Sequence, residues 1–327
     1  MASIQDVAKH AKVGVGTVSR VISENGYVSE ETRQKVQKAI NELNYKPNEL
    51  ARNLLLNRTN IIAVIIPDIA NPFFAALVNE IERELRRYGY KTMLCNTAGE
   101  ATNEQAYLDM LERNMVDGLL TGTHTLDTEI YRRVKRPIVA FDTPPLADGM
   151  PVITVNHGAG GCLAANALLQ SGCKEVLQFT DQAVEGFPFI KRHDEFRRVT
   201  KEAGIICHDY FVAWNQFNDE YFSEIAADCF RMYPHVDGVF GTDILAMHFM
   251  KHALLNGKKI PEDICVVAYD GTGILDLSYP SASAVVQPIK DLARVGVDQL
   301  LSIIKGKKTN QSCIELDVVF RKGMTTI

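Results

Sequence analysis

The spacing of apolar residues changes once along the chain, near residue 60, and this change limits the folds that the chain can adopt. Before it, three short segments carry apolar residues at helical intervals with no strand pattern between them, over residues 4–11, 16–23 and 29–43. After it, short apolar runs alternate with amphipathic helical segments. The sequence therefore predicts a small all-α head followed by a larger α/β body.

The head has the order of elements of a helix-turn-helix. Two short helices joined by a tight turn precede a longer one, and Ser29 followed by Glu30 and Glu31 is a strong start signal for the third helix. In a helix-turn-helix the second helix enters the major groove of DNA. On this pattern alone, a generic three-helix bundle fits equally well.

Charge is distributed unevenly between the two parts. Residues 1–58 carry nine Lys or Arg against six Asp or Glu, a net charge of +3, whereas the rest carries 26 cations and 34 acids, a net charge of −8. A mildly basic head on an acidic body suits a nucleic-acid-binding module joined to a part that does not touch nucleic acid. Solvated helix faces produce such asymmetry too, so charge supports DNA binding without deciding it.

The body alternates strands with helices, which calls for parallel sheets. Strands are expected at 61–66, 91–95, 118–121, 138–141, 152–155, 176–179, 236–241 and 264–269, and helices at 73–87, 104–113, 161–171, 193–203, 219–232 and 245–255. Because one small sheet needs fewer strands and the series restarts after Asn156, we expect two similar lobes. Gly158, Gly160 and Gly161 complete no G-x-G-x-x-G and are expected at a turn and helix entry.

Polar and aromatic residues gather where predicted strands end. They are Asp68, Asn71, Phe73 and Phe74 after the first strand, Asp142 after the fourth, Thr242 and Asp243 after the strand at 236–241, and Asp270 after the last. Ligands of such sheets bind at the carboxyl ends of strands. Carboxylates and Arg forks pair with the vicinal hydroxyls of a sugar, and flat rings cover its apolar faces. For any single Asp, a helix N-cap is the plainer interpretation.

Patterns typical of other protein classes are missing from the sequence. There is no G-x-S-x-G turn and no Walker loop, and the seven cysteines are scattered without a C-x-x-C. No apolar stretch approaches the ~20 residues of a membrane helix, and the first ten residues lack the apolar core of a signal peptide. We expect a cytoplasmic protein that is not an enzyme, holds no cofactor or metal and contacts no membrane.

The head also contains specific runs of residues. They are Ile4-Gln5-Asp6-Val7-Ala8-Lys9-His10-Ala11, Thr17-Val18-Ser19-Arg20-Val21-Ile22, Gly26-Tyr27-Val28-Ser29, Leu43-Asn44-Tyr45-Lys46-Pro47-Asn48 and Ala51-Arg52-Asn53-Leu54. Together they resemble the head and hinge of the lactose and galactose repressor (LacI/GalR) family of transcriptional regulators. The resemblance favours the helix-turn-helix over the generic bundle.

This resemblance implies which head residues contact DNA. Val15, Gly16 and Arg20 fall where the family's recognition helix faces base edges, and Thr17 and Ser19 lie near phosphates. The Arg20 fork can read a guanine, while Val15 offers only apolar contact. The family usually has Gly at the position of Lys12 and Ser at that of Gly14. These departures affect the expected operator sequence and not DNA binding, since Gly at a helix cap costs only a few tenths of a kcal/mol.

Residues 48–58 match the family's hinge helix. A segment this short is marginal as a free helix and is expected to fold on the operator. Asn48, Ala51 and Leu54 are the implied DNA contacts, and Leu54 matches the leucine that wedges between base steps in the minor groove. Ordinary core packing is the alternative for Leu54.

The body resembles the same family and its periplasmic sugar-binding relatives. The matching phrases are Asn71-Pro72-Phe73-Phe74, Val116-Asp117-Gly118, Phe141-Asp142, Val236-Asp237-Gly238-Val239-Phe240, Ile260-Pro261-Glu262-Asp263, Ala268-Tyr269-Asp270 and Gln287-Pro288. The implied effector contacts are Asn71, Phe73, Phe74, Asp142, Arg192, Thr242, Asp270 and Gln287, with an aromatic at Trp214 or, on the spacing, at Phe217. Glu195 stands where the family usually has Gly.

The resemblance implies a regulator with three parts. They are a DNA-binding domain at 1–47, a hinge at 48–58 and an effector-binding and dimerisation domain at 59–327, with lobe one at about 59–157 plus 289–316 and lobe two at about 158–286 plus 317–327. A homodimer on a pseudo-palindromic operator, controlled by a sugar or sugar phosphate between the lobes, is expected. The phrasing is most similar to sucrose- and ribose-operon repressors. Control by a purine or a protein corepressor is the alternative.

Overall fold

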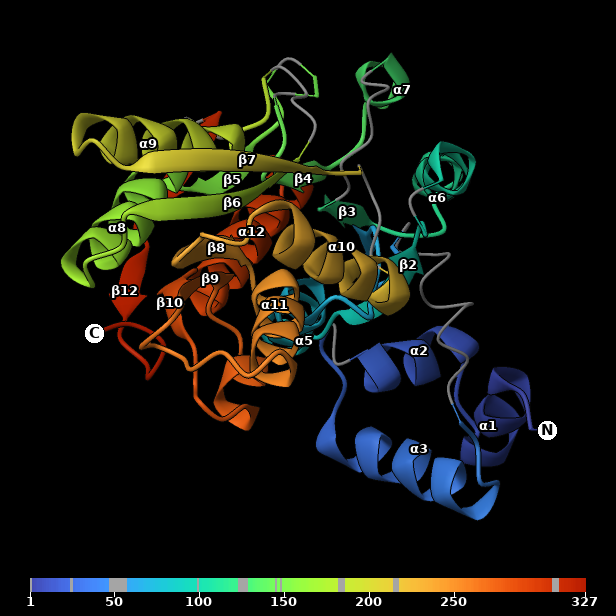
Figure 1. The fold of residues 1–327 in the computed structure, drawn as a ribbon. Helices are drawn as coiled ribbons and strands as arrows, with labels where there is room; N and C mark the ends of the chain where they lie inside the picture. The colour runs from blue at the N-terminus through green and yellow to red at the C-terminus, as the bar shows by residue number, and fades with distance from the viewer. Residues whose placement is uncertain are drawn as a thin grey trace. The chain divides into compact units, whose positions relative to one another are not determined.

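The computed structural model describes residues 2–23, 26–46, 58–98, 100–122, 129–144, 146–147, 149–181, 186–213, 218–307 and 312–327. It separates into two compact units, Met1–Thr59 and Asn60–Ile327 (Figure 1). The first unit is helical and the second contains every strand of the described chain. We call them the head and the body.

The head consists of α1 (Ile4–Ala11), α2 (Val15–Ser23) and α3 (Glu30–Glu42) around a small apolar core. Helix α1 begins at a capping box, in which Ser3 Oγ accepts from the Asp6 N–H at 3.2 Å and the Asp6 carboxylate accepts from the Ser3 N–H at 2.8 Å. It ends at Lys12, whose φ of 54° is left-handed. Fully buried Val7, Val18 and Val36 bring one side chain from each helix into the core.

The body contains two six-stranded sheets. The first has the order β11-β5-β4-β3-β1-β2, with β1 (Ile61–Ile66), β2 (Lys91–Asn96), β3 (Gly118–Thr121), β4 (Ile138–Phe141), β5 (Val152–Val155) and β11 (Cys313–Leu316) all parallel. The second has the order β12-β10-β9-β8-β6-β7, with β6 (Glu175–Asp181), β7 (Ile206–Val212), β8 (Gly238–Thr242), β9 (Cys265–Asp270), β10 (Ser283–Val286) and β12 (Val319–Arg321). Only β12, paired antiparallel with β10, departs from the expected parallel arrangement in this part of the chain. We refer to the two sheets with their helices as lobe one and lobe two.

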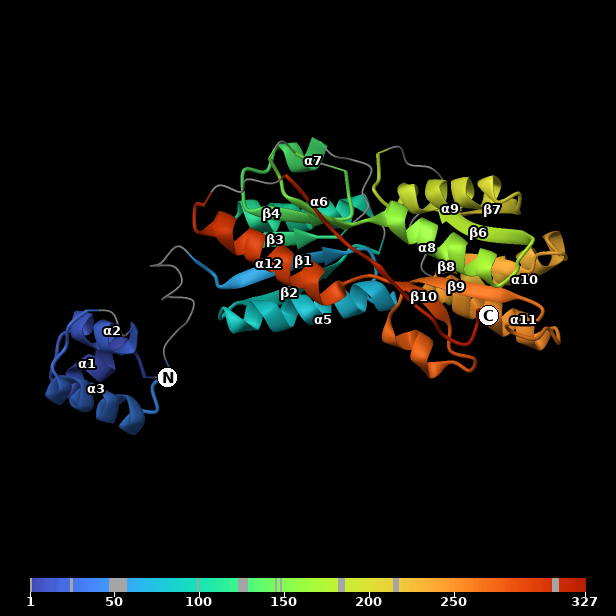
Figure 2. The same cartoon turned by 90° about the vertical axis from the view of Figure 1, so that its left-hand side faces the viewer.

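Helices cover both sheets, as Figure 2 shows for the two halves of the body. Lobe one has α5 (Pro72–Arg87), α6 (Ala101–Glu112), α7 (Glu129–Arg132) and α12 (Ile289–Ile304). Lobe two has α8 (His157–Gln170), α9 (Ile190–Glu202), α10 (Asp219–Met232), α11 (Asp243–Leu255) and the short 3₁₀ helix η1 (Gly273–Leu277). The chain passes between the lobes at residues 156, 287–288 and 317–318. The expected α/β body of two lobes is confirmed.

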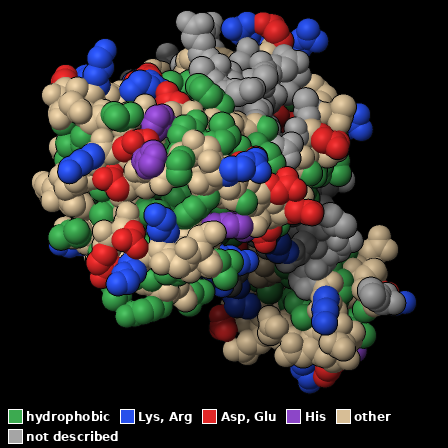
Figure 3. Space-filling view, viewed as in Figure 1, with side chains coloured by type: hydrophobic (Ala, Val, Ile, Leu, Met, Phe, Trp, Pro, Cys, Tyr) green, Lys and Arg blue, Asp and Glu red, His purple; other side chains and the backbone are tan. Residues whose placement is uncertain are grey.

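The surface and the interior of the body differ as expected for a globular protein. On the face seen in Figure 3, acidic and basic side chains are interspersed over the body. The strands of both sheets carry apolar side chains into the buried cores, and β1 is buried from Ile62 to Ile66. Strands buried on both faces appear in the sequence as continuous apolar runs, which is why β1, β3, β4 and β9 could be predicted.

Helix α8 begins earlier than predicted, and its glycines lie inside it. Asn156 caps the helix by accepting from the Ala159 N–H at 2.9 Å, so His157 is its first residue. Gly158, Gly160 and Gly161 are therefore helical residues and not turn residues. The reason is tertiary contact: a Cβ on Gly161 would lie 2.0 Å from the carbonyl oxygen of Arg192 in α9.

The close approach of α8 to α9 predicts opposite effects for two glycine substitutions. Gly161→Ala should lower the free energy of unfolding by about 2–3 kcal/mol, because one helix must move away from the other. Gly158→Ala is the control, since the nearest atom to its added Cβ is the Glu195 Cγ at 3.4 Å. Alanine there should leave stability unchanged or raise it by up to about 0.5 kcal/mol through helix propensity. Urea unfolding followed by circular dichroism measures both, and equal effects would refute this account of the packing.

Candidate functional site

The outer face of α2 is the candidate DNA-binding surface. Val18 and Val21 point into the head core, while Val15, Gly16, Ser19 and Arg20 are exposed. Thr17 is half-buried. The exposed and buried positions of α2 thus separate the residues expected to meet DNA from those that hold the head together. The interpretation of these residues as DNA contacts remains a prediction.

The hinge residues Asn48, Ala51 and Leu54, and both candidates for the lobe-two aromatic, Trp214 and Phe217, lie outside the described residues.

In lobe one, the predicted effector residues lie at the carboxyl ends of β1 and β4. Asn71 caps α5 by accepting from the Phe73 N–H at 2.9 Å. Phe73 and Phe74 meet edge to face with ring centres 5.3 Å apart. Phe74 is buried in the lobe-one core and Phe73 packs partly buried beside it, so Phe74 has a packing role in addition to any ligand contact.

Asp142, which follows β4, is held by two neighbours. Its Oδ1 accepts from the Thr154 hydroxyl at 2.6 Å and lies 2.7 Å from the His157 Nε2. Its φ is 54°, a left-handed value that few residues other than glycine adopt. Such strain persists only where surrounding contacts impose it, and it is typical of ligand sites.

In lobe two, Arg192 lies over an aromatic ring. Its guanidinium carbon is 4.5 Å from the ring centre of Tyr269 and 5.6 Å from that of Phe189, within cation–π range. Its Nε–H donates to the His193 Nε2 at 3.1 Å. Burial, with the Arg192 charge second, lowers the pKa of His193 well below its usual value, which keeps that ring neutral. Arg192 is thus fixed by a stack and a hydrogen bond.

Asp270 and Gln287 form a second polar pair at the end of β9. Gln287 Nε2 donates to Asp270 Oδ1 at 2.8 Å. The φ of Asp270 is 116°, so both predicted effector aspartates have left-handed backbones. Burial, reinforced by the nearby Asp243 charge, raises the pKa of Asp270 well above its usual value. An ionised Asp270 carboxylate without a partner would therefore lower the stability of the folded chain.

Thr242 and Asp243 end β8 and begin α11. Asp243 is buried and accepts from the N–H groups of Gly271 and Thr272, at 3.1 and 2.7 Å, and from the Thr272 hydroxyl at 2.6 Å. Burial raises its pKa to about 6. These contacts fix the loop that follows Asp270. Thr242 is half-buried at the helix cap.

Sequence reasoning missed three residues at this site: His157, Tyr269 and His193. All three are almost fully buried and bonded to predicted site residues or next to them. A polar residue directly before an apolar helical run was the available signal for His157. Nothing in the sequence distinguishes Tyr269 from an ordinary buried strand residue.

A pocket of about 250 Å³ lies between the lobes. Ala70 and Asn71 line it from lobe one, and Asp219, Phe222 and Ile244 line it from the first turns of α10 and α11. Within the described ranges, no three His, Cys, Asp or Glu side chains are grouped to hold a metal ion. Within the same ranges, no helix has both the length and the apolar character needed to cross a bilayer.

Comparison with protein families covers nearly the whole chain. Residues 3–48 match the family described as "Bacterial regulatory proteins, lacI family". Residues 59–312 match "Periplasmic binding proteins and sugar binding domain of LacI family".

Curated relatives are similar over their full lengths. The ribose operon repressor of Halalkalibacterium halodurans is 36% identical, with 94% of this chain and 92% of the relative covered. The sucrose operon repressor of Streptococcus mutans is also 36% identical, with 96% of both covered. The HTH-type transcriptional repressor PurR of Aliivibrio salmonicida is 30% identical, with 99% of both covered.

Among solved structures, the Lac repressor dimer bound to operator and the anti-inducer ONPF has the same fold. The TM-score is 0.86 over 100% of this chain and 99% of that one, at 22% identity. The relatives are named as repressors, which agrees with the expectation that the chain is not an enzyme. By the match of both its head and its body, the chain belongs to the LacI family of bacterial regulatory proteins.

Proposed function

We propose that the protein is a repressor of a sugar-utilisation operon and that a sugar or sugar phosphate bound between its lobes controls its affinity for operator DNA. In this proposal residues 1–47 bind DNA in the cytoplasm, 48–58 form the hinge, and 59–327 bind the effector and dimerise. The observation that carries the proposal is the set of ionisable side chains held in place near the boundary of the lobes, Asp142, Arg192 and Asp270. The names of the two ribose and sucrose operon relatives support the substrate class.

The chemistry of the cleft suits a polyhydroxylated ligand. Carboxylates accept from vicinal hydroxyls, and an arginine donates to ring and hydroxyl oxygens or to a phosphate. Gln287 Oε1 is buried and accepts no hydrogen bond from the described residues. An unsatisfied buried acceptor costs about 1–3 kcal/mol, which a ligand hydroxyl would recover. The partly buried Phe73 ring offers a flat apolar surface for a sugar face.

Control of DNA binding requires that the ligand change the relation between the lobes. The chain passes between them at three places, so closure around a ligand moves lobe one against lobe two as connected bodies. A coupling of 1–3 kcal/mol, typical of allostery, corresponds to a roughly 5- to 150-fold change in operator affinity.

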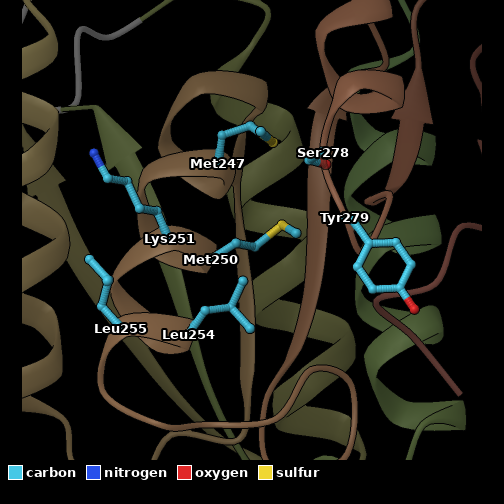
Figure 4. A pocket seen from close by; sticks show the side chains of 7 residues that line it. All are labelled: Met247, Met250, Lys251, Leu254, Leu255, Ser278 and Tyr279. Atoms are coloured by element: carbon cyan, nitrogen blue, oxygen red, sulfur yellow. The ribbon is translucent and has the colours of Figure 1, made fainter.

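We further propose that lobe two provides a face for a second copy. Met247, Met250, Lys251, Leu254 and Leu255 of α11 line a pocket of about 290 Å³ with Ser278 and Tyr279 after η1, as Figure 4 shows. Leu255, Leu277 and Tyr279 are 74%, 86% and 83% exposed. Large apolar side chains grouped on one exposed face favour burial against another molecule. A dimer supplies two heads for a pseudo-palindromic operator.

Sugar binding should be visible as thermal stabilisation of the full chain. In a panel of sugars, sugar phosphates and purines, we expect at least one sugar to raise the melting temperature by several degrees, because ligand at 100 times Kd adds about 2.7 kcal/mol. The rise should disappear in Arg192→Ala and in Asp270→Ala.

Arg231→Ala is the control, since Arg231 is an exposed arginine on α10 paired only locally with Asp228 at 2.6 Å. It should keep the full rise. A rise in melting temperature with a purine and with no sugar would exclude the sugar and favour a purine corepressor. If no small molecule raises the melting temperature, the sugar is also excluded and a protein corepressor is favoured.

Arg20 should matter for sequence-specific binding more than for binding to DNA in general. On a DNA site selected by the wild-type protein from a random pool, Arg20→Ala should weaken binding by roughly 5- to 150-fold, the 1–3 kcal/mol of a bidentate guanine contact. Lys38→Ala, which removes an exposed cation on α3, is the matched control and should change Kd much less. Fluorescence anisotropy measures both, and equal losses on selected and random DNA would reduce Arg20 to a phosphate contact.

The dimer face predicts which substitutions make monomers. Leu255→Asp and Tyr279→Asp should each raise the dimer dissociation constant at least tenfold, because a carboxylate would have to be desolvated in the interface. Ile206→Asp on β7 introduces the same charge at another exposed apolar site, 57% exposed, and should leave the dimer intact. Sedimentation velocity distinguishes the outcomes. Dimers that persist in both face variants would place the interface elsewhere.

A further inference from the structure

A chain of polar side chains joins the two lobes. His157 is the first residue of α8, directly after the point where the chain leaves lobe one. Its Nε2 lies 2.7 Å from Asp142 Oδ1 in lobe one, and its Nδ1 lies 2.9 Å from the Tyr269 hydroxyl in lobe two. One imidazole therefore bridges a residue from each sheet.

Both members of the bridge that lie in lobe two are closed off from solvent. His157 is 1% exposed and Tyr269 is fully buried. Gly160 makes room for the tyrosine, because a Cβ at that position would lie 2.9 Å from its hydroxyl oxygen. Polar groups buried to this degree are costly when unpaired, so each contact of the bridge depends on the other.

The donor and acceptor groups of the three side chains set the direction of each hydrogen bond in the bridge. An ionised carboxylate only accepts, so His157 Nε2 carries a hydrogen and donates it to Asp142. In a neutral ring Nδ1 then accepts, and the Tyr269 hydroxyl donates to it. Burial raises the pKa of Tyr269, so that hydroxyl keeps its proton. The bridge runs in one direction, from tyrosine through histidine to carboxylate.

The bridge also reaches the cation of the cleft. The ring of Tyr269 lies under the Arg192 guanidinium at 4.5 Å, and the hydroxyl of the same ring meets His157. Asp142 and Arg192 come from different lobes and carry opposite charges. They are linked through two buried rings and not through the ligand space alone.

We infer that His157 is a positioning residue, which sets the orientation of the Asp142 carboxylate for a sugar and ties that orientation to Tyr269 and Arg192 of lobe two. This inference rests on the proposed function, because it assigns a role within the same cleft. It adds that His157 couples the two lobes energetically even before a ligand binds. Ligand contact with Asp142 is thereby transmitted to lobe two through the imidazole.

The first arm of the test needs no ligand. Unfolding of the full chain is measured for Asp142→Ala, Tyr269→Phe and the double variant, in the wild-type background and in His157→Phe. We expect the effects to be non-additive in the wild type, by at least about threefold in the unfolding equilibrium constant, because His157 contacts both side chains. In His157→Phe they should add. Additive effects in both backgrounds would overturn the inference.

The second arm uses D-ribose and sucrose as probes. His157→Phe and Tyr269→Phe should weaken binding of whichever sugar stabilises the wild type by roughly tenfold, as expected when a hydrogen bond of the bridge is lost. They should also shrink the change in operator Kd that the sugar causes. His157→Gln keeps one donor and one acceptor and should recover part of both effects.

His208→Phe is the matched control. His208 pairs with Glu175 at 3.0 Å within lobe two. The substitution therefore removes a histidine–carboxylate contact that does not connect the two lobes. This variant should bind sugar, and change its operator Kd on binding sugar, as the wild type does. If neither sugar binds the wild type while the ligand-free arm is non-additive, the effector class is wrong and His157 still couples the lobes. If a sugar binds and the His157 variants respond as the wild type does, the inference fails and the proposed function stands.

Discussion

Parallel pairing of strands is the constraint on which the arrangement of this body depends. Parallel neighbours require a crossover between them, so every helix returns the chain to the same edge and the carboxyl ends of the strands emerge together. In each lobe this edge carries the polar residues, Asp142 after β4 in one and Asp270 after β9 in the other. The two sheets are joined at the crossing segments, and the Asp142–His157–Tyr269 contacts connect the polar end of β4 in lobe one with β9 in lobe two.

Sequence patterns predicted inner strands such as β1, β3, β4 and β9, because those strands are buried on both faces and appear as unbroken apolar runs, but they missed β10, which lies between β9 and β12. They did not predict β7, at residues 206–212, which is the outermost strand of its sheet and mixes His208 and Asp209 with exposed Ile206 and Phe211. Nor did they predict the start of α8, because local propensity treats Gly160 and Gly161 as breakers. Their reason lies in Tyr269 and Arg192, more than 30 residues away in the sequence.

The same distinction holds for the candidate site. Asp142, Arg192 and Asp270 follow strands or match family phrases, so sequence could nominate them. The residues that hold them, His157 and Tyr269, are ordinary in their local patterns and acquire their role only when two lobes meet. Likewise the sequence predicted Phe74 as a ligand contact, whereas its burial in the lobe-one core shows that it also packs there.

The left-handed turn at Lys12 carries two effects of opposite sign. Holding a lysine at φ 54° costs about 1 kcal/mol or more relative to glycine, which adopts that backbone freely. A glycine at this turn would therefore make the free head more stable, and would also remove a positive charge one turn from the recognition helix. Each phosphate contact releases counterions and steepens the dependence of binding on salt. Lysine at this turn therefore lowers the stability of the free head relative to glycine, and the charge that it adds beside α2 attracts an anionic partner less strongly as ionic strength rises.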